Sequence, residues 1–311
     1  FQPDWLWGKN RTDSTNHYLI DAVRGITKNI KSQSTAAEAT DTAVLKSFDS
    51  DGFTLGDGSL NQSSHTFVTW NWKANGAGSS NTDGSVSSTV SANTTSGFSI
   101  VKYTNPSSGS PFTVGHGLGA APKMIIIKNL SSAQTWGVYH ASVGFGKYLR
   151  LDTNNAEASA NLVTATSATT FSAYQDHHST GNELIAYCFA EKTGFSKFGS
   201  YTGNGSTDGS YIHLGFKPAF VMLKYSAPGG GVGSWHMYDN KRKGYNTEND
   251  YVQANTTSSE NSDTDQVDLL SNGFKCRATG SDSNENGSTY IYMAFSEESI
   301  VSSNGIPAVA R

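Results

Sequence analysis

Short apolar runs recur along the chain, and three of them share one pattern of a proline, large apolar residues and a lysine. They read "PDWLWGK" at 3–9, "PKMIIIK" at 122–128 and "PAFVMLK" at 218–224. Their length and their aromatic or β-branched content are typical of strands. Because polar residues do not alternate strictly with apolar ones, we expect both faces of these strands to be buried, as in a sandwich covered by loops or by a neighbour.

Further landmarks follow the three runs in one order. The strand-like segments at 17–21, 136–140 and 235–239 come first, then Glu38, Glu157 and Glu260, then Phe53, Phe171 and Phe274, and finally the aromatic-rich strands at 66–72, 183–189 and 289–295. This shared order predicts tandem copies of one unit. An opening strand, "GFSIVKYT" at 97–104 and "GFSKFGSYT" at 194–202, precedes only the second and third copies.

The turn-rich composition of these units predicts an all-β protein of tandem β-sandwich repeats, jelly-roll or concanavalin-like. The expected organisation is a first, N-terminally incomplete unit at 1–75, a linker at 76–96, a second unit at 97–193, a third unit at 194–297 and a tail at 298–311. An incomplete sheet leaves an open edge. We expect that edge to receive a strand from sequence upstream of Phe1, from the tail or, as the favoured donor, from a neighbouring chain.

Two segments remain open between helix and strand, at 35–45 and 154–163. Cys188 and Cys276 occupy different places in the unit, which predicts two unpaired, buried thiols.

Charge and composition narrow the classes of partner. Of the 311 residues only 15% are charged and the net charge is −4, so uncharged polar side chains must cover most of the surface. No basic patch is present to attract nucleic acid, and no apolar stretch approaches the roughly 18–20 residues that span a bilayer. We therefore expect neither a nucleic-acid partner nor membrane insertion.

The recurring glutamates are the first candidates for chemistry. A glycosidase needs two carboxylates about 5–10 Å apart. The residues aligned on the preceding strand are Asp21, His140 and Asp239, so the second unit would lack its second carboxylate. A structural contact at the glutamates, and no catalytic role, is the favoured interpretation.

Histidines and aromatic residues supply weaker candidates. His116 and the "DHH" at 176–178 lack the spacing of metal ligands, so neither a metal nor a cofactor is expected. Exposed aromatic rings can stack on sugars, and the weak candidates for such a site are Trp70, Trp136, Tyr201 and Trp235. Aromatic residues at aligned positions are, however, more often part of a core.

Several phrases together resemble a known family. They include "QPDWLWGKNR", "HYLIDAVRG", "VGHGLGAAPKMIIIK", "GFSKFGSYTGNGSTDG" and the ending "NGIPAVAR". These resemble a repeat domain of uncharacterised function in structural proteins of marine tailed bacteriophages, and the resemblance covers nearly the whole chain outside 74–97.

The resemblance implies a component of the virion, an extracellular particle, and assigns no catalytic residues. The favoured role is a tail fibre or spike-like appendage that recognises the host surface. The alternative is a capsid decoration or cement protein, and a glycan-degrading enzyme is the residual interpretation. The expected partners are other copies of the chain in a homo-oligomer, other virion proteins and, more weakly, a host-surface glycan.

Overall fold

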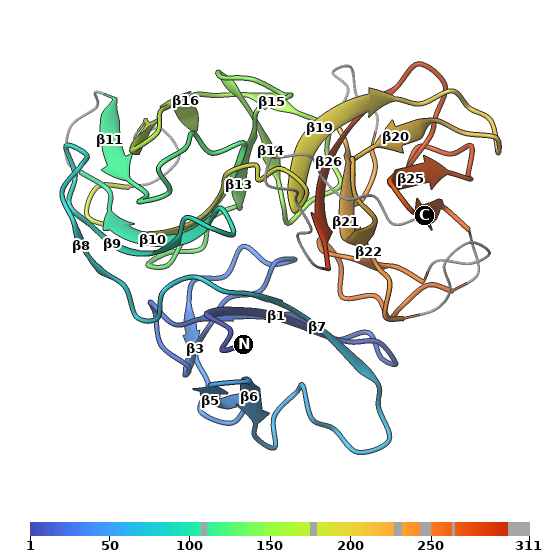
Figure 1. The fold of residues 1–311 in the computed structure, drawn as a ribbon. Coiled ribbons are helices and arrows are strands. Elements are labelled where there is room, and N and C mark those ends of the chain that lie inside the picture. Colours follow the sequence, from blue (N-terminus) through green and yellow to red (C-terminus); the bar gives the residue numbers. More distant parts are fainter. Residues whose placement is uncertain (107–110, 175–178, 227–231, 243–249, 263–264, 298–311) are drawn as a thin grey trace.

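All regular elements of the described part of the chain are strands in antiparallel sheets, and the fold is of the β-sandwich class. The computed structural model describes residues 1–106, 111–174, 179–226, 232–242, 250–262 and 265–297. No helix in these ranges is long and apolar enough to cross a membrane. Three lobes surround a common centre, and we define them as residues 1–75, 76–193 and 194–297 (Figure 1).

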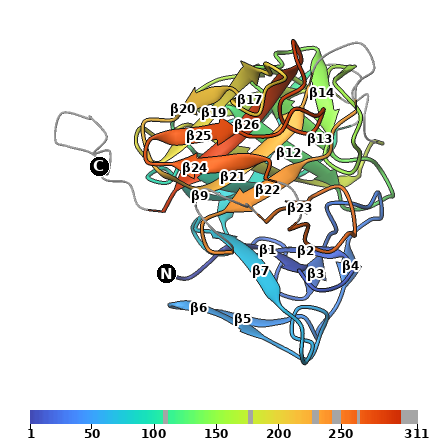
Figure 2. The ribbon, with the colours of Figure 1, turned by 90° about the vertical axis from the view of Figure 1, so that its right-hand side faces the viewer.

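The first lobe contains the smallest central sheet. Its strands are β1 (Trp5–Asn10), β2 (His17–Asp21) and β7 (Phe67–Trp72), in the order β2-β1-β7. Two antiparallel pairs complete the lobe: β3 (Lys28–Asn29) with β4 (Ala39–Thr40), and β5 (Leu45–Asp49) with β6 (Gly52–Leu55). The β5–β6 hairpin lies at the outer end of this lobe (Figure 2).

The second lobe is a two-layer sandwich. Its large sheet, in the order β15-β14-β13-β12-β18-β10-β9-β8, contains β8 (Ser79–Asn81), β9 (Ser88–Asn93), β10 (Phe98–Thr104), β12 (Met124–Asn129), β13 (Gly137–His140), β14 (Lys147–Arg150), β15 (Ala158–Ser159) and β18 (Glu183–Phe189). The small sheet, in the order β11-β17-β16, contains β11 (Phe112–Gly115), β16 (Val163–Thr166) and β17 (Thr170–Ala173).

The third lobe has the same two-layer form. Its large sheet, in the order β19-β26-β21-β22-β23, contains β19 (Ser196–Thr202), β21 (Pro218–Tyr225), β22 (His236–Asp239), β23 (Val252–Gln253) and β26 (Thr289–Ser296). The small sheet, in the order β20-β25-β24, contains β20 (Tyr211–His213), β24 (Val267–Leu270) and β25 (Gly273–Cys276).

Both faces of each proline-led strand are buried, as the apolar runs predict. Alternate side chains point to opposite faces of a strand. In β12, Met124 and Ile126 enter a central cluster shared by all three lobes, whereas Ile125 and Ile127 enter the core of the second lobe. The same alternation holds for β1 and β21. The central sheets therefore pack against their own lobe on one face and against the other lobes on the opposite face.

The segment at 76–96, expected to be a linker, instead contains β8 and β9. β9 pairs with β10, and β8 pairs with β9, so the two strands extend the large sheet of the second lobe. Val90 is buried in the core of this lobe, with Ala92 packed against it. β9 lies between β10 and the edge strand β8, so its main chain is paired on both sides although most of its side chains are small or polar. The segments at 35–45 and 154–163 also contain short strands, β4 and β15, rather than helices.

One glycine in the first lobe marks a close contact. A Cβ atom at Gly8 in β1 would lie 2.4 Å from Cδ1 of Leu60. The positions in the same register of β12 and β21 are Ile127 and Leu223, which fill the cores of their own lobes. Leu60 supplies that volume in the first lobe, so residue 8 has no room for a side chain.

Candidate functional site

A lysine follows the apolar residues in each proline-led strand, and all three lysines are fully buried. Lys9, Lys128 and Lys224 are each 0% exposed. Across the lobe boundaries, Nζ of Lys9 donates to the Thr257 carbonyl at 3.2 Å, Nζ of Lys128 to the Thr35 carbonyl at 2.8 Å, and Nζ of Lys224 to the Asn154 carbonyl at 3.0 Å. The first lobe thus donates to the third, the second lobe to the first, and the third lobe to the second, so the three contacts form a closed ring.

Each ammonium group is also bonded within its own lobe. The further acceptors are the carbonyls of Asn10 and Asp13 for Lys9, of Gln134 for Lys128, and of Gly233 for Lys224. Burial lowers the pKa of Lys224 to about 7 and the pKa values of Lys9 and Lys128 to about 8. The carbonyl acceptors oppose this shift because they stabilise the charged amine. With no exposed surface, these amines bind the lobes together and do not meet a substrate.

A second set of side chains spans the same boundaries. Trp136 Nε1 donates to the Lys31 carbonyl at 3.1 Å, Trp235 Nε1 to the Arg150 carbonyl at 2.7 Å, and His17 Nε2 to the Gln253 carbonyl at 3.1 Å. The tautomer of His17 follows from Trp7, whose Nε1 donates to Nδ1 of His17 at 3.0 Å. The proton must therefore be on Nε2, and burial lowers the pKa of His17 to about 3.

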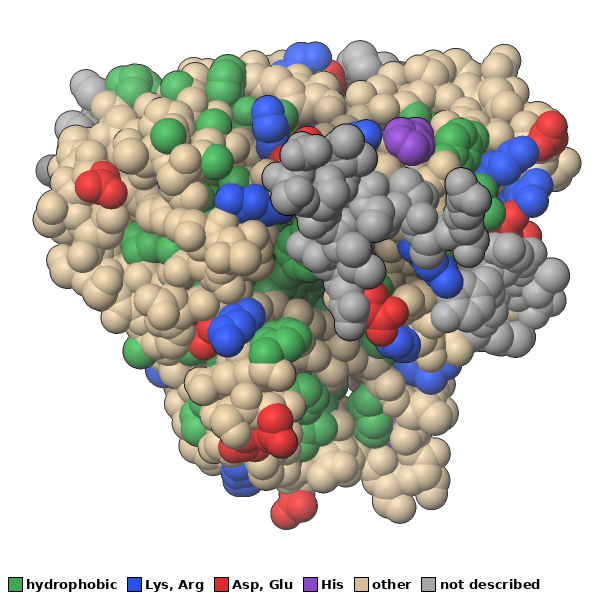
Figure 3. Space-filling model, viewed as in Figure 1, with side chains coloured by type: hydrophobic (Ala, Val, Ile, Leu, Met, Phe, Trp, Pro, Cys, Tyr) green, Lys and Arg blue, Asp and Glu red, His purple; other side chains and the backbone are tan. Residues whose placement is uncertain are grey.

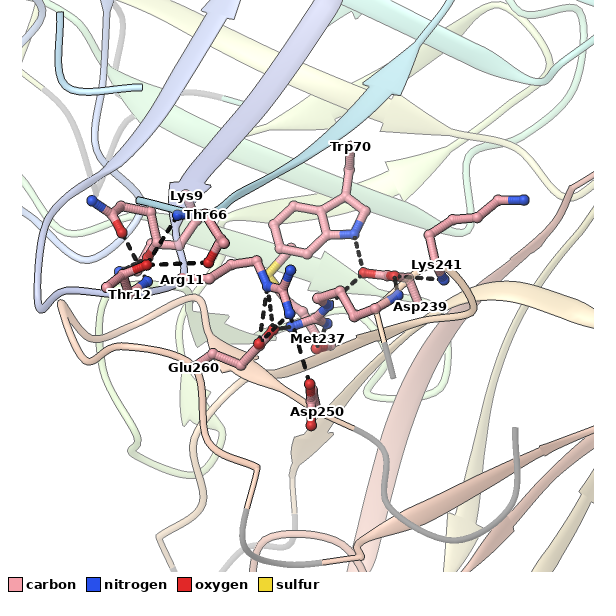
Figure 4. A network of polar contacts seen from close by, with 12 residues as sticks. Lys9, Arg11, Thr12, Thr66, Trp70, Met237, Asp239, Lys241, Asp250 and Glu260 are labelled. Atoms are coloured by element: carbon pink, nitrogen blue, oxygen red, sulfur yellow. Dashed lines mark hydrogen bonds and ion pairs between the residues drawn. The ribbon is translucent and has the colours of Figure 1, made fainter. Parts of the chain in front are cut away.

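Glu260 is the centre of a charged network between the third and first lobes (Figure 4). Nε of Arg11 lies 2.9 Å from both carboxylate oxygens of Glu260, and Nη1 of Arg242 lies 2.8 Å from Oε2. The Glu260 amide also donates to the Arg11 carbonyl at 2.9 Å. Only 10% of the Glu260 side chain and 3% of the Arg242 side chain are exposed. Charge-assisted hydrogen bonds of this kind are strong where water is excluded.

The network continues from Arg242 to an indole of the first lobe. Nε of Arg242 donates to Oδ2 of Asp239 at 2.8 Å, and Nε1 of Trp70 donates to the same oxygen at 3.1 Å. The guanidinium of Arg242 also lies over the Trp70 ring, 5.6 Å from its centroid. Trp70 is therefore held by both a hydrogen bond and a cation–π contact.

A similar network joins the first lobe to the second. Arg24 donates to Asp21 at 2.6 Å and to Glu38 at 3.2 Å, and the Tyr187 hydroxyl donates to Asp21 at 2.8 Å. The boundary between the second and third lobes differs. There the ring of His140 bonds to the Tyr292 carbonyl, and Glu157 pairs with Lys147 of its own lobe.

Comparison with known proteins assigns a family without an activity. A family model described as a domain of unknown function (DUF7483) matches residues 1–299. The chain belongs to this family. No curated protein and no solved structure matches it.

The aromatic residues proposed as a glycan site do not form one in this DUF7483 chain. Trp136, Trp235 and Trp70 are 0%, 1% and 7% exposed and donate their indole N–H groups across lobe boundaries. Tyr201 stacks on Tyr290 with ring centroids 5.1 Å apart, and its hydroxyl donates to the Ser283 carbonyl. The three tryptophans are therefore buried contacts between lobes, whereas Tyr201 is half-buried and packs against the core of the third lobe.

The other candidates have structural environments. Glu38 and Glu260, both partly buried, form ion pairs with the buried side chains of Arg24 and Arg242, in line with the structural interpretation. Nδ1 of His116 accepts from the Leu118 amide at 3.2 Å, while residues 176–178 lie outside the described residues. Cys188 and Cys276 are buried, unpaired thiols in the cores of the second and third lobes. Sequence reasoning missed the lysine ring, although a lysine ending an apolar run in all three units was its signal.

A cavity of about 560 Å³ lies beside the network, between the first and third lobes. One wall is residues 68–73, which include most of β7, and the other is formed by Phe195, Phe220, Phe295 and Glu297. Trp70 and Asp239 belong to both the network and the cavity wall. The cavity is mainly apolar, which suits an apolar occupant rather than a charged substrate.

Proposed function

We propose that the chain is a non-enzymatic structural protein of a bacteriophage virion, most directly part of a tail fibre or spike-like appendage. The main support for this proposal is that the recurring charged side chains bind the lobes to one another. Lys9, Lys128, Lys224 and Glu260 all form contacts between lobes. This arrangement suits a load-bearing role better than catalysis. The phage assignment itself rests on the resemblance of the sequence.

We infer further that the three lobes are tandem copies of one β-sandwich unit. In each lobe the proline-led strand lies between an aromatic strand and the closing strand: β1 between β2 and β7, β12 between β13 and β18, and β21 between β22 and β26. The lysine contacts also connect matched positions. The acceptors Thr35, Asn154 and Thr257 each lie three residues before Glu38, Glu157 and Glu260.

Head-to-tail contacts either close into a ring or continue as a filament. Here the third set of contacts returns to the first lobe, so the ring is complete within one chain. A closed ring prevents one lobe from moving without disturbing both of its neighbours. Such a body is suited to transmit force or to hold a fixed spacing on a particle.

The proposed setting is the outer surface of the particle. Uncharged polar side chains and backbone together make up most of the described surface seen in Figure 3, with charged groups scattered among them. Such a surface suits contact with virion proteins, with other copies of the chain or with a neutral glycan. Because Trp70, Trp136 and Trp235 are buried, any glycan site must use other residues.

Locating the protein on purified particles tests the proposal. Gold-labelled antibody should bind at the tail or its appendages. A label distributed on the capsid lattice would assign the decoration role instead, and absence from particles that contain the other virion proteins would overturn the proposal. In parallel, release of reducing sugar from host surface glycans by the pure chain would refute the non-enzymatic role.

A further inference from the structure

The sheet of the first lobe has an open edge along β7. The Asp4 amide donates to the Trp72 carbonyl and the Arg11 amide to the Thr66 carbonyl, so residues 66 and 72 face β1. Successive backbone groups of a strand point to alternate sides. Thr69 and Asn71 therefore direct their amide and carbonyl groups away from β1, and no described strand pairs with them.

The other two lobes fill the corresponding edge. β10 pairs with β18 in the second lobe, and β19 pairs with β26 in the third. Both strands also supply apolar side chains to the central cluster, namely Phe98 and Ile100 from β10 and Phe198 from β19. In the first lobe the 560 Å³ cavity lies along this edge of β7. It therefore offers both the main-chain groups and the apolar space that a fourth strand would use.

We propose that residues 298–311 of the same chain add to β7 as the fourth strand of the first sheet. The path of the chain supports this occupant. From β18, the closing strand of the second lobe, the chain passes through residues 190–195 into β19, the opening strand of the third. If the chain took the same step on leaving β26, it would reach the opening position of the first lobe. Glu297, the residue before this segment, already lies on the cavity wall.

The direction of the segment also fits. Opening strands run antiparallel to closing strands and begin beside their last residues, as Phe98 opposes Phe189 and Ser196 opposes Phe295. A fourth strand on β7 would thus begin beside Trp72. The ring of Trp72 lies 5.9 Å from that of Phe295, near the end of β26. The end of β26 therefore lies close to Trp72, where a fourth strand on β7 would begin.

Length and sequence agree with this role. β10 and β19 each have 7 residues, fewer than the segment 298–311 contains. The segment includes "SIV" at 299–301, the same triplet that β10 carries at 99–101, where Ile100 enters the central cluster. Pro307 is compatible with this position because the added strand would form the edge of the sheet.

Hydrogen exchange at single-residue resolution tests the proposal on the full chain. The amides of Thr69 and Asn71 should exchange roughly 100-fold more slowly than unpaired amides, because they donate to the added strand. Removing residues 298–311, or replacing them by a glycine–serine segment of equal length, should abolish that protection and leave the Trp70 amide, which faces β1, unchanged. A synthetic peptide of residues 298–311 should restore protection to the shortened chain.

Three results would overturn the proposal. Fast exchange at Thr69 and Asn71 in the full chain would mean that the edge is open. Equal protection with and without residues 298–311 would assign the edge to another segment. Protection that appears only with dimerisation, and is lost on dilution, would show that the strand comes from a second copy of the chain.

Discussion

Replacing Glu260 by glutamine removes the charge shared by two arginines at the boundary between the first and third lobes. Arg11 then retains Asp250, whose carboxylate lies 3.7 Å away, while Arg242 retains Asp239 at 2.8 Å. Breaking a buried pair by removing one partner costs about 3–5 kcal/mol. Because the Arg11 side chain is 24% exposed, we expect the lower end, about 3 kcal/mol.

The aligned glutamates provide matched controls. Glu38→Gln leaves Arg24 bonded to Asp21 at 2.6 Å, so we expect an intermediate loss of about 1–2 kcal/mol. Glu157→Gln affects a pair with Lys147, whose side chain is 43% exposed, and should cost less than about 1 kcal/mol. The same substitution at three aligned positions is therefore expected to lower the free energy of unfolding by three different amounts.

Thermal and urea unfolding measure these differences. With an unfolding entropy of about 2.1 cal/mol/K per residue, a chain of 311 residues loses about 1.5 °C of Tm per kcal/mol. Glu260→Gln should then lower Tm by about 5 °C and Glu157→Gln by less than about 2 °C. Equal shifts for the two variants would refute the idea that Glu260 joins the lobes.

Three further predictions concern buried groups. Burial lowers the pKa values of His17 and His140 from 6.5 to about 3 and about 4. As the pH falls, the histidines of the unfolded chain bind protons first, so the free energy of unfolding should fall from pH 6.5 towards pH 4, by about 2 kcal/mol per histidine at pH 5. A urea midpoint that stays constant over that range would contradict this. Gly8→Ala places a methyl group against Leu60 and should cost about 1–3 kcal/mol in urea unfolding, whereas an unchanged midpoint would show that Leu60 moves freely. Lys224→Met leaves buried carbonyls without their donor and should cost about 2–4 kcal/mol, and a more stable variant would mean that desolvation outweighs those bonds.

Much of the strand arrangement could be predicted from local pattern. The apolar runs containing Trp5, Ile125 and Val221 predict strands buried on both faces because no polar residue interrupts them. The sequence also indicates the three-stranded first sheet that the described residues form, because the order of landmarks is otherwise shared. These features depend on neighbouring residues and on comparison between similar segments, and both are present in one sequence.

The contacts between lobes could not be predicted in the same way. Residues 76–96 lack large apolar side chains, and β9 is a strand because it pairs with β8 and β10. The aligned positions of Trp136 and Trp235 favour a core over a sugar platform, but the sequence does not show their partners, the distant carbonyls of Lys31 and Arg150. Acceptors of this kind are backbone atoms, so residue type carries no signal for them.

The central claim is that three lobes form one body, closed by contacts that return from the third lobe to the first. Hydrogen exchange followed by mass spectrometry in increasing urea tests it most directly, with peptides from β1, β12 and β21 as reporters. If the lobes form one body, all three central strands should exchange through one shared opening, with the same free energy and the same dependence on urea. Exchange of β1 through a separate opening of lower free energy, while β12 and β21 remain protected, would contradict it.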